Sequence, residues 1–218
     1  MKILILGATG RMGRLVLEEA LNQGHKINCL VREPGKIKLS HANLKILQGT
    51  PAQIADLENA MKGCNNIIST LNISRKNDFP WSKLRTPPTF LSKVAKNILA
   101  ASKNNRIDRL IVCSAWGVSE TKKDIPFWFK WFIENSNIGV AYKDHKRQEN
   151  IIKSSELNWT IVRPTGLTNF KRERNIVESF NNSPKPKLTI SRINAAKYIV
   201  NAMSKNGLIR KTPVISEM

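Results

Sequence analysis

The sequence predicts an α/β fold, a doubly wound parallel sheet with helices on both faces. Short apolar segments typical of buried strands alternate with helical segments of about 10–15 residues, the pattern of strand–helix–strand units. A glycine-rich segment follows the first strand directly and begins the first helix. Crossovers between parallel strands are right-handed, so successive helices cover both faces of the sheet. The chain has 218 residues, 41% of them hydrophobic, and we expect residues 1–218 to form a single domain.

In the first half of the chain each predicted strand is apolar and each helix has one apolar face. After the first strand, Leu15, Val16, Ala20 and Leu21 recur at helical spacing, and Gly24 ends the helix. We expect strands at 2–6, 27–31, 44–47 and 66–71, and helices at 12–23 and 52–62.

The second half continues the alternation after a polar and basic loop at 72–86. Pro87 and Pro88 begin a helix that runs to about Lys103, and Pro164 ends the sixth strand. Residues 169–186 are expected to be irregular. Further strands are expected at 110–113, 159–162, 188–190 and 213–215, and further helices at 126–134, 140–154 and 194–204.

The composition sets limits on the partners. Lys and Arg number 36 against 16 Asp and Glu, a net charge of +20, but the bases are spread along the chain and no recognition motif accompanies them, so we do not expect nucleic acid as a partner. Three distant cysteines argue against a disulfide framework and for a cytoplasmic protein. We expect no metal site, no leader segment, no transmembrane helix, and a monomer or homodimer.

The strongest motif is the glycine-rich turn at residues 7–13. Glycines permit a tight turn and let backbone N–H groups approach a pyrophosphate, and the helix N-terminus adds donors and a positive dipole end. Placement between a strand and a helix makes the motif far more specific than glycine spacing alone. The sequence therefore predicts a dinucleotide site, and its residues are Gly7-Ala8-Thr9-Gly10-Arg11-Met12-Gly13.

The end of the second strand indicates which dinucleotide is preferred. An acid at this position accepts a hydrogen bond from the ribose 2′-hydroxyl of NAD, but this strand ends at Arg32, and Lys36 follows. A cation cannot accept that bond, whereas it pairs with a 2′-phosphate. We therefore expect NADP rather than NAD, although Glu33 is an acid in the same segment. Leu71, after the fourth strand, is expected to line the same site.

These residues and later segments resemble a known family. The glycine motif, Val31-Arg32, Ser114 at the end of the fifth strand, and the segment Asn158 to Pro164 are similar to the atypical short-chain dehydrogenase/reductases with an NAD(P)H-binding domain. Within that family the chain resembles biliverdin-IXβ reductase (flavin reductase) and bacterial NAD(P)-binding oxidoreductases. The resemblance implies a Rossmann-like domain and hydride transfer near Ser114. It also implies that four residues lie against the nicotinamide, namely Pro164, Thr165, Gly166 and Leu167.

The catalytic residues have two alternative assignments. Tyr142 and Lys146 match the Tyr-x-x-x-Lys spacing of ordinary family members, and positions four apart share one helix face. Counting back without gaps from Pro164 instead puts His145 in the lysine position and Ala141 in the tyrosine position. The second assignment resembles biliverdin-IXβ reductase, in which the proton comes from water or from the histidine. Ser114 is a candidate catalytic residue in both assignments.

Two segments, about 115–140 and 165–190, are expected to cover the substrate. The first contains the run Phe127 to Phe132, which is either a helix packed over the sheet, a lid for a planar ligand or a helix on a membrane surface. We predict an NADPH-dependent reductase acting on a planar flavin, quinone, tetrapyrrole or carbonyl acceptor. The alternatives are a non-catalytic, NmrA-like NADP sensor and an epimerase- or dehydratase-type enzyme.

Overall fold

The computed structural model describes residues 1–170 and 174–218 and contains an eight-stranded sheet. All neighbouring strands are parallel except the last pair, β10 and β8, which is antiparallel. The strands lie in the order β3 (Leu44–Gln48), β2 (Lys26–Val31), β1 (Lys2–Leu6), β4 (Asn66–Ser69), β5 (Arg109–Cys113), β6 (Trp159–Pro164), β10 (Val214–Glu217) and β8 (Ile176–Ser179). The predicted fold class is confirmed.

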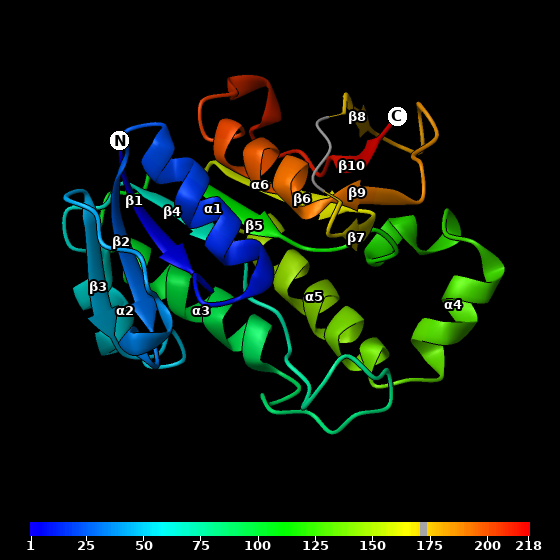
Figure 1. Ribbon diagram of the computed structural model, residues 1–218, viewed down its shortest axis with the longest axis horizontal. Coiled ribbons are helices and arrows are strands. Elements are labelled where there is room, and N and C mark those ends of the chain that lie inside the picture. Colours follow the sequence, from blue (N-terminus) through cyan, green and yellow to red (C-terminus); the bar gives the residue numbers. More distant parts are fainter. Residues whose placement is uncertain (171–173) are drawn as a thin grey trace.

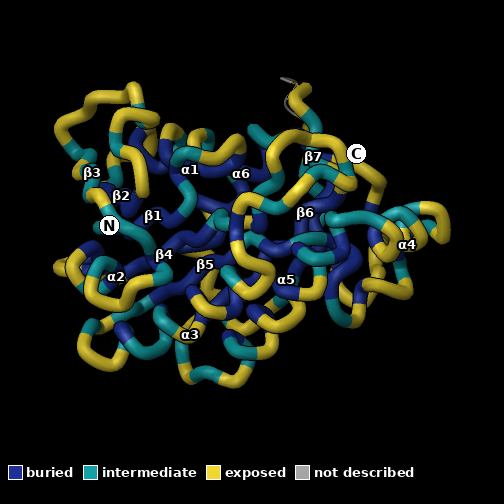
Figure 2. Tube along the Cα trace, turned by 90° about the horizontal axis from the view of Figure 1, so that it is seen from below, coloured by how far each residue is buried: buried dark blue, intermediate teal, exposed yellow. Residues whose placement is uncertain are grey.

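Helices cover both faces of this sheet, as Figures 1 and 2 show. Each strand alternates its side chains, so Ile3 and Ile5 belong to one apolar core and Leu4 and Leu6 to the other. The first core lies under α1 (Arg11–Asn22) and α6 (Arg192–Asn201). The second lies under α2 (Ile54–Met61), α3 (Phe90–Ser102) and α5 (Ile138–Lys153).

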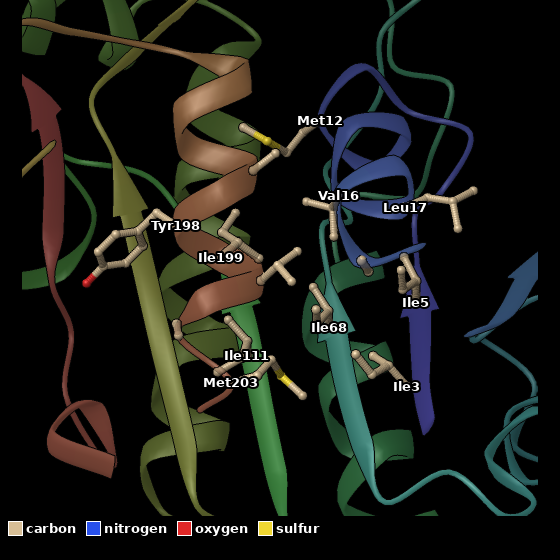
Figure 3. Close-up of a cluster of buried hydrophobic side chains, with 14 of the residues drawn as sticks. Ile3, Ile5, Met12, Val16, Leu17, Ile68, Ile111, Tyr198, Ile199 and Met203 are labelled. Carbon is tan, nitrogen blue, oxygen red and sulfur yellow. The ribbon is translucent and has the colours of Figure 1, made fainter. Parts of the chain in front are cut away.

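Figure 3 shows how the first core joins the two helices that cover it. Val16 and Leu17 from α1 and Ile199 from α6 pack over Ile5 and Ile111 of the sheet, and all five side chains are buried. Burial of side chains of this size stabilises a fold by about 1.5–3 kcal/mol each. This core therefore fixes α1, and with it the glycine turn that precedes α1.

The chain reverses its direction of strand addition between β1 and β4. From β1 the order grows through β2 to β3 on one side, and from β4 it grows through β5 to β6 on the other. The loops after β1 and β4 therefore separate at the carboxyl edge of the sheet, where ligands of such folds bind.

Most predicted elements lie within a few residues of their observed positions, but the last third of the chain differs. Within the segment expected to be irregular, β8 pairs with β10. The unpredicted β7 (Gly166–Thr168) pairs with β9 (Thr189–Ser191), which lies one residue from the strand expected at 188–190, in a separate two-stranded sheet. Strands β7 and β8 have only three or four residues and depend on distant partners, so their local sequence carries little signal. Residues 171–173, inside the predicted covering segment 165–190, lie outside the described residues.

Helix α4 (Phe127–Glu134) packs against α5 and not over the sheet, so the first of the three alternatives for the aromatic run is wrong. It projects beyond the end of the molecule opposite β3 (Figure 1). None of the helices in the described part of the chain has the length and apolar character needed to span a bilayer.

A buried arginine connects the amino end of β5 to the turn after α6. The guanidinium of Arg109 donates to the carbonyl oxygens of Asn158, Ala202 and Lys205 and to the hydroxyl of Thr160. Burial lowers the pKa of Arg109, but a guanidinium is not deprotonated in proteins, so the side chain remains charged. Each of these carbonyls also accepts a backbone N–H, so Arg109 supplies a second donor and ties the turn after α6 to the sheet.

We expect Arg109→Met to destabilise the protein by about 2–4 kcal/mol, because it removes several buried hydrogen bonds that a charged group donates. Urea unfolding measures the change. Arg106→Met is the matched control, since the side chain of Arg106 is 92% exposed. Equal stability of the two variants would contradict this role of Arg109.

Candidate functional site

The turn after β1 brings three backbone segments into close contact. Gly7 has φ +90°, a left-handed conformation that glycine adopts without strain. A Cβ on Gly13 would lie 2.0 Å from the carbonyl oxygen of Gly7 and 2.8 Å from the hydroxyl of Thr70. No side chain larger than hydrogen fits at Gly13, so α1 starts directly against the β1 turn and the end of β4.

This placement leaves the N-terminus of α1 facing the carboxyl edge of the sheet. The N-cap residue is Gly10, no side chain caps the helix, and its first turn contains no acidic residue. The first N–H groups of α1 and its positive dipole end therefore suit an anion such as a pyrophosphate.

A cavity of about 960 Å³ runs along this edge of the sheet. It begins beside Arg32 at the end of β2, passes the glycine turn, and ends beside Ser114 and α5. Its lining includes most residues expected to bind a cofactor: Gly7, Thr9, Gly10, Arg11, Met12, Arg32, Leu71, Pro164, Thr165, Gly166 and Leu167. Its length and volume suit a ligand with two ends, such as a dinucleotide.

Two expected cofactor residues do not line the cavity. Gly13 lies behind the turn and acts through its packing. Lys36 lies in the short helix after Arg32, where its Nζ is 2.6 Å from an oxygen of Glu33, and it is outside the lining. A hydrogen bond from Lys36, together with the charges of Lys36, Arg32 and Arg85, lowers the pKa of Glu33. Glu33 is thus paired within a basic group of side chains, and Arg32 is the member of that group that lines the cavity.

An ion pair crosses the mouth of the cavity. Arg11, in the first turn of α1, donates to both carboxylate oxygens of Asp78, at 3.0 and 2.8 Å. Asp78 belongs to the 72–86 loop, which sequence reasoning treated only as basic and polar. Arg192 also lines the cavity. Burial and the nearby charge of Arg11 lower the pKa of Arg192, and the charge of Asp78 partly offsets this effect. Three charged groups therefore surround the place where a pyrophosphate would lie.

At the other end of the cavity, Ser114 belongs to a buried ionic network. Its hydroxyl donates to Glu149 at 2.7 Å, and Glu149 accepts two hydrogen bonds from Arg163, at 2.9 and 2.6 Å. Arg163 also donates to Glu120 through two nitrogens. The network connects the ends of β5 and β6, helix α5 and the short helix that contains Glu120. It fixes the direction in which the Ser114 hydroxyl points.

The network holds both of its carboxyl groups ionised. Burial acts against the charge of Glu120, but hydrogen bonds and the charge of Arg163 lower its pKa to about 2. Burial also acts against the charge of Glu149, and the bonds from Arg163, Ser114 and Ser119 again bring its pKa below the usual value. The hydrogen bonds and charges of both glutamates raise the pKa of Arg163 despite its burial.

Helix α5 turns His145 and Tyr142 toward the cavity. Both line it together with Ile138 and Ala141. His145 is buried, with its Nδ1 3.2 Å from Gln148 Oε1. Burial lowers the pKa of His145, against the raising effects of Gln148, Glu149 and Asp144, so the ring is neutral at pH 7.

The structure does not bring Tyr142 and Lys146 together as a catalytic pair. Lys146 is exposed and outside the cavity lining, because it lies about 90° around α5 from the mean direction of the cavity-facing residues. The Tyr142 hydroxyl donates to the Trp116 carbonyl at 3.2 Å, and burial raises the pKa of Tyr142. Among the described residues, no lysine lowers that pKa.

The neighbouring Asp144 has a structural role. It is buried and accepts hydrogen bonds from the backbone N–H groups of Leu91 and Ser92 and from the Ser92 hydroxyl. These contacts cap α3, whose own N-cap residue, Thr89, makes no side-chain cap bond. Asp144 thus aligns α5 with α3 and holds His145 at the cavity.

Several lining residues were not predicted from the sequence, notably Thr86, Phe90 and Arg192. Their positions depend on loops and on tertiary contacts. The rule that ligands lie beyond the carboxyl ends of strands points to the loop after β4 but not to these individual residues. Among the described residues, no group of three His, Cys, Asp or Glu side chains lies together as a metal site would require.

The fold and this site define an NAD(P)-binding α/β protein of the Rossmann type, similar to short-chain dehydrogenase/reductases. The family model described as NAD(P)H-binding matches residues 7–206, and the chain belongs to that family. NAD(P)-dependent oxidoreductase-type proteins are prominent among its relatives.

Two curated relatives match most of the chain. It is 32% identical over 175 residues to the uncharacterized sugar epimerase YhfK of Bacillus subtilis, covering 78% of this chain and 73% of the relative. It is 29% identical over 168 residues to the photosystem II assembly factor Ycf39 of Cyanophora paradoxa, covering 77% of this chain. The match spans only 46% of that longer protein's length.

Solved structures show the same fold at low identity. One is ChuY, an anaerobillin reductase from Escherichia coli O157:H7, with a TM-score of 0.81 and 18% identity, covering 100% of this chain and 97% of that one. Another is a short-chain dehydrogenase/reductase from Veillonella parvula in complex with NADP, with a TM-score of 0.77 and 19% identity. That match covers 99% of this chain and 94% of the other.

We expect Gly13→Ala to abolish NADPH binding, because the new Cβ would collide with the Gly7 carbonyl and displace the start of α1. Calorimetric titration with NADPH measures the loss. Gly207→Ala is the matched control, since a Cβ there meets nothing within 4 Å. Unchanged affinity in Gly13→Ala would show that this turn does not form the binding site.

We expect Glu149→Gln to destabilise the protein by about 3–5 kcal/mol at pH 7, because it leaves Arg163 buried with its charge poorly compensated. The pKa of both glutamates is lower in the folded than in the unfolded chain. Their stabilising effect is therefore complete above the ordinary value of 4.5 and is lost as the pH falls below it, for Glu120 toward about 2.

Urea unfolding at several pH values tests this expectation. The variant should lose part of the acid sensitivity of the wild type between pH 4.5 and 2, whereas the exposed control Glu18→Gln should retain it. A variant with wild-type stability and wild-type acid sensitivity would exclude the network as a determinant of the fold.

Proposed function

We propose that the protein is an NADPH-dependent reductase that transfers hydride to a planar, conjugated acceptor such as a flavin, a quinone, a tetrapyrrole or a related carbonyl compound. The observation that carries the proposal is the continuity of one cavity, from the cationic Arg32 end through the glycine turn to Ser114 and the aromatic residues around α5. One compartment thus has room for both a dinucleotide and an acceptor.

The residues fit NADPH. The close approach of Gly13 to Gly7 leaves α1 uncapped toward the pyrophosphate position, and Arg32 is suited to a 2′-phosphate. Arg11 and Arg192 would neutralise the pyrophosphate, and Pro164 to Leu167 would lie against the nicotinamide. NADPH supplies the hydride when it is bound. The structure of the Veillonella parvula relative in complex with NADP supports the choice of cofactor.

The residues near the acceptor end orient the substrate. Ser114 donates its own hydrogen to Glu149, so its oxygen is suited to accept a hydrogen bond from an acceptor N–H or O–H. His145 is neutral, and its bond with Gln148 fixes the ring. A neutral imidazole is a weak acid, so we assign proton delivery to water and a positioning role to His145.

Two covering segments complete the proposed substrate site. Ala115, Trp116, Phe129 and Ile138 line the cavity from the segment 115–140. Thr165 to Leu167 line it from the segment 165–190. Aromatic and aliphatic walls suit a flat conjugated ring. The fold shared with a protein named anaerobillin reductase supports an acceptor of this kind.

An epimerase is the second candidate, since a relative that is 32% identical is named a sugar epimerase. That reaction, in this family, uses a tyrosine activated by a lysine. The orientation of Tyr142 toward the Trp116 carbonyl and the exposure of Lys146 disfavour it. A wild-type rate in Tyr142→Phe would agree with the reductase and exclude the epimerase.

We expect Arg32→Ala to weaken NADPH binding by about 10–100-fold and NADH binding much less, because a charge-assisted hydrogen bond contributes about 1.5–3 kcal/mol. Calorimetric titration with both nucleotides measures the two affinities. Lys45→Ala on β3 is the control for the loss of one positive charge, since Lys45 is exposed and outside the cavity lining. An equal loss for both nucleotides would contradict the assignment of Arg32 to the 2′-phosphate.

Turnover tests the proposed reaction. NADPH absorbance is followed with the wild type in the presence of a flavin, a quinone, a tetrapyrrole or a simple carbonyl compound. The reductase predicts oxidation with at least one of these acceptors, and Ser114→Ala should lower kcat about 10–100-fold if the serine orients the acceptor. Tight NADPH binding without oxidation by any acceptor would favour the NADP sensor.

A further inference from the structure

Helix α4 presents large aromatic side chains to solvent. Phe127, Trp128 and Trp131 are 83%, 63% and 54% exposed, and Ile133 is the buried residue of the helix. At 100° per residue, positions 127, 131, 128 and 132 follow one another within about 140° of arc. One side of α4 is therefore continuously aromatic, and it projects from the end of the molecule (Figures 1 and 2).

The 72–86 loop extends this aromatic side. The Trp81 ring lies 5.8 Å from Phe132 in an edge-on arrangement and 5.3 Å from Phe79. The Trp81 indole N–H donates to the Asn135 carbonyl at 2.7 Å, and the Asn137 side chain donates to the carbonyls of Trp81 and Ser82. These bonds fix the loop against the end of α4. We call the five exposed residues Phe79, Trp81, Phe127, Trp128 and Trp131 the aromatic surface.

The aromatic surface leads directly to the cavity. The Trp128 ring lies 5.5 Å from Phe129, and the Phe129 ring lies 6.4 Å from Tyr142. Phe129 and Tyr142 both line the acceptor end of the cavity. A row of rings thus runs from solvent to the place where an acceptor would bind.

Basic residues surround the aromatic surface. The loop that contains Phe79 and Trp81 also contains four basic residues and one acid, Asp78, which is already paired with Arg11. Lys123 precedes α4 and Lys130 lies on it, both exposed, and Glu134 is paired with Lys122 at 2.7 Å. The chain as a whole carries a net charge of +20.

We propose that the aromatic surface binds the interface of an anionic phospholipid bilayer. Tryptophan and phenylalanine insert at the level of the headgroups, and lysine and arginine are attracted to anionic lipid. The exposed rings surrounded by positive charge match this combination, and the net charge of each molecule opposes its pairing with a second copy. The cavity would then open toward the bilayer. If the protein is the reductase proposed above, the acceptor that it reduces is then an apolar ring compound taken from the membrane.

Vesicle co-sedimentation with the full chain and no nucleotide tests the proposal. Vesicles of equal parts phosphatidylcholine and phosphatidylglycerol should retain the wild type, and vesicles of phosphatidylcholine alone should not. Trp128→Ser/Trp131→Ser should weaken retention at least about tenfold, because two large rings no longer insert. Leu39→Ser/Ile54→Ser is the matched control, since Leu39 and Ile54 are exposed apolar residues 39% and 42% accessible to solvent.

A second pair of variants tests the charge. Lys123→Glu/Lys130→Glu should weaken retention at least about tenfold. Lys45→Glu/Lys62→Glu changes the net charge equally in exposed positions away from α4 and should reduce retention less.

Three outcomes would overturn the proposal: no retention of the wild type, equal retention of the Trp128/Trp131 variant, or a dimer in sedimentation velocity that this variant abolishes. The last would make a second copy the occupant. Oxidation of NADPH with a water-soluble acceptor is measured separately. Failure of vesicle binding with intact turnover would therefore leave the proposed reductase standing.

Discussion

The buried pairing of Arg163 with Glu149 is the interaction around which the Ser114 end of the cavity is built. Two hydrogen bonds join the side chains, both of which are almost completely buried, so neither charge has water as an alternative partner. The pair fixes the end of β6 against the middle of α5. Ser114 at the end of β5 and Glu120 in the following short helix are added to it by further hydrogen bonds. The network consequently fixes these four segments around the cavity relative to one another.

The opposite half of the cavity depends on a steric constraint. Gly13 allows α1 to begin in contact with the β1 turn, and the apolar core shared by α1 and α6 holds the helix there. Because the two halves are fixed separately, a ligand that spans them is held at both ends by rigid groups. The Arg11–Asp78 pair joins the halves across the mouth, and it is exposed, so it adds little to the stability of the free protein.

The sequence predicted the features that depend on local pattern. The glycine turn needs particular residues at consecutive positions, and the β-strands of the first half are short apolar runs, so both are visible without tertiary information. The pairing of Arg163 with Glu149 was not predicted, because these residues lie on different elements and each resembles an ordinary charged residue in the sequence. The two assignments for α5 were also left open, since a rotation of the helix by one residue exchanges His145 and Lys146 at the cavity, and only packing decides that rotation.

The same limit explains the errors elsewhere. Strand β8 forms only because β10, far along the chain, provides an edge for it, and its four residues have no strong strand pattern. The aromatic run of α4 was consistent with a buried helix, a lid or a membrane-facing helix, because composition does not say which side of a helix is covered. The structure leaves Trp128 and Trp131 uncovered and turns Phe129 toward the cavity.

A crystal structure of the protein with NADP is the decisive test of how the cavity binds its cofactor. We predict the 2′-phosphate beside Arg32, the pyrophosphate at the N-terminus of α1, and the nicotinamide ring next to Ser114 and the segment Pro164 to Leu167. A nicotinamide that lies in solvent, or a dinucleotide bound in the reverse direction with its adenine beside Ser114, would contradict this arrangement.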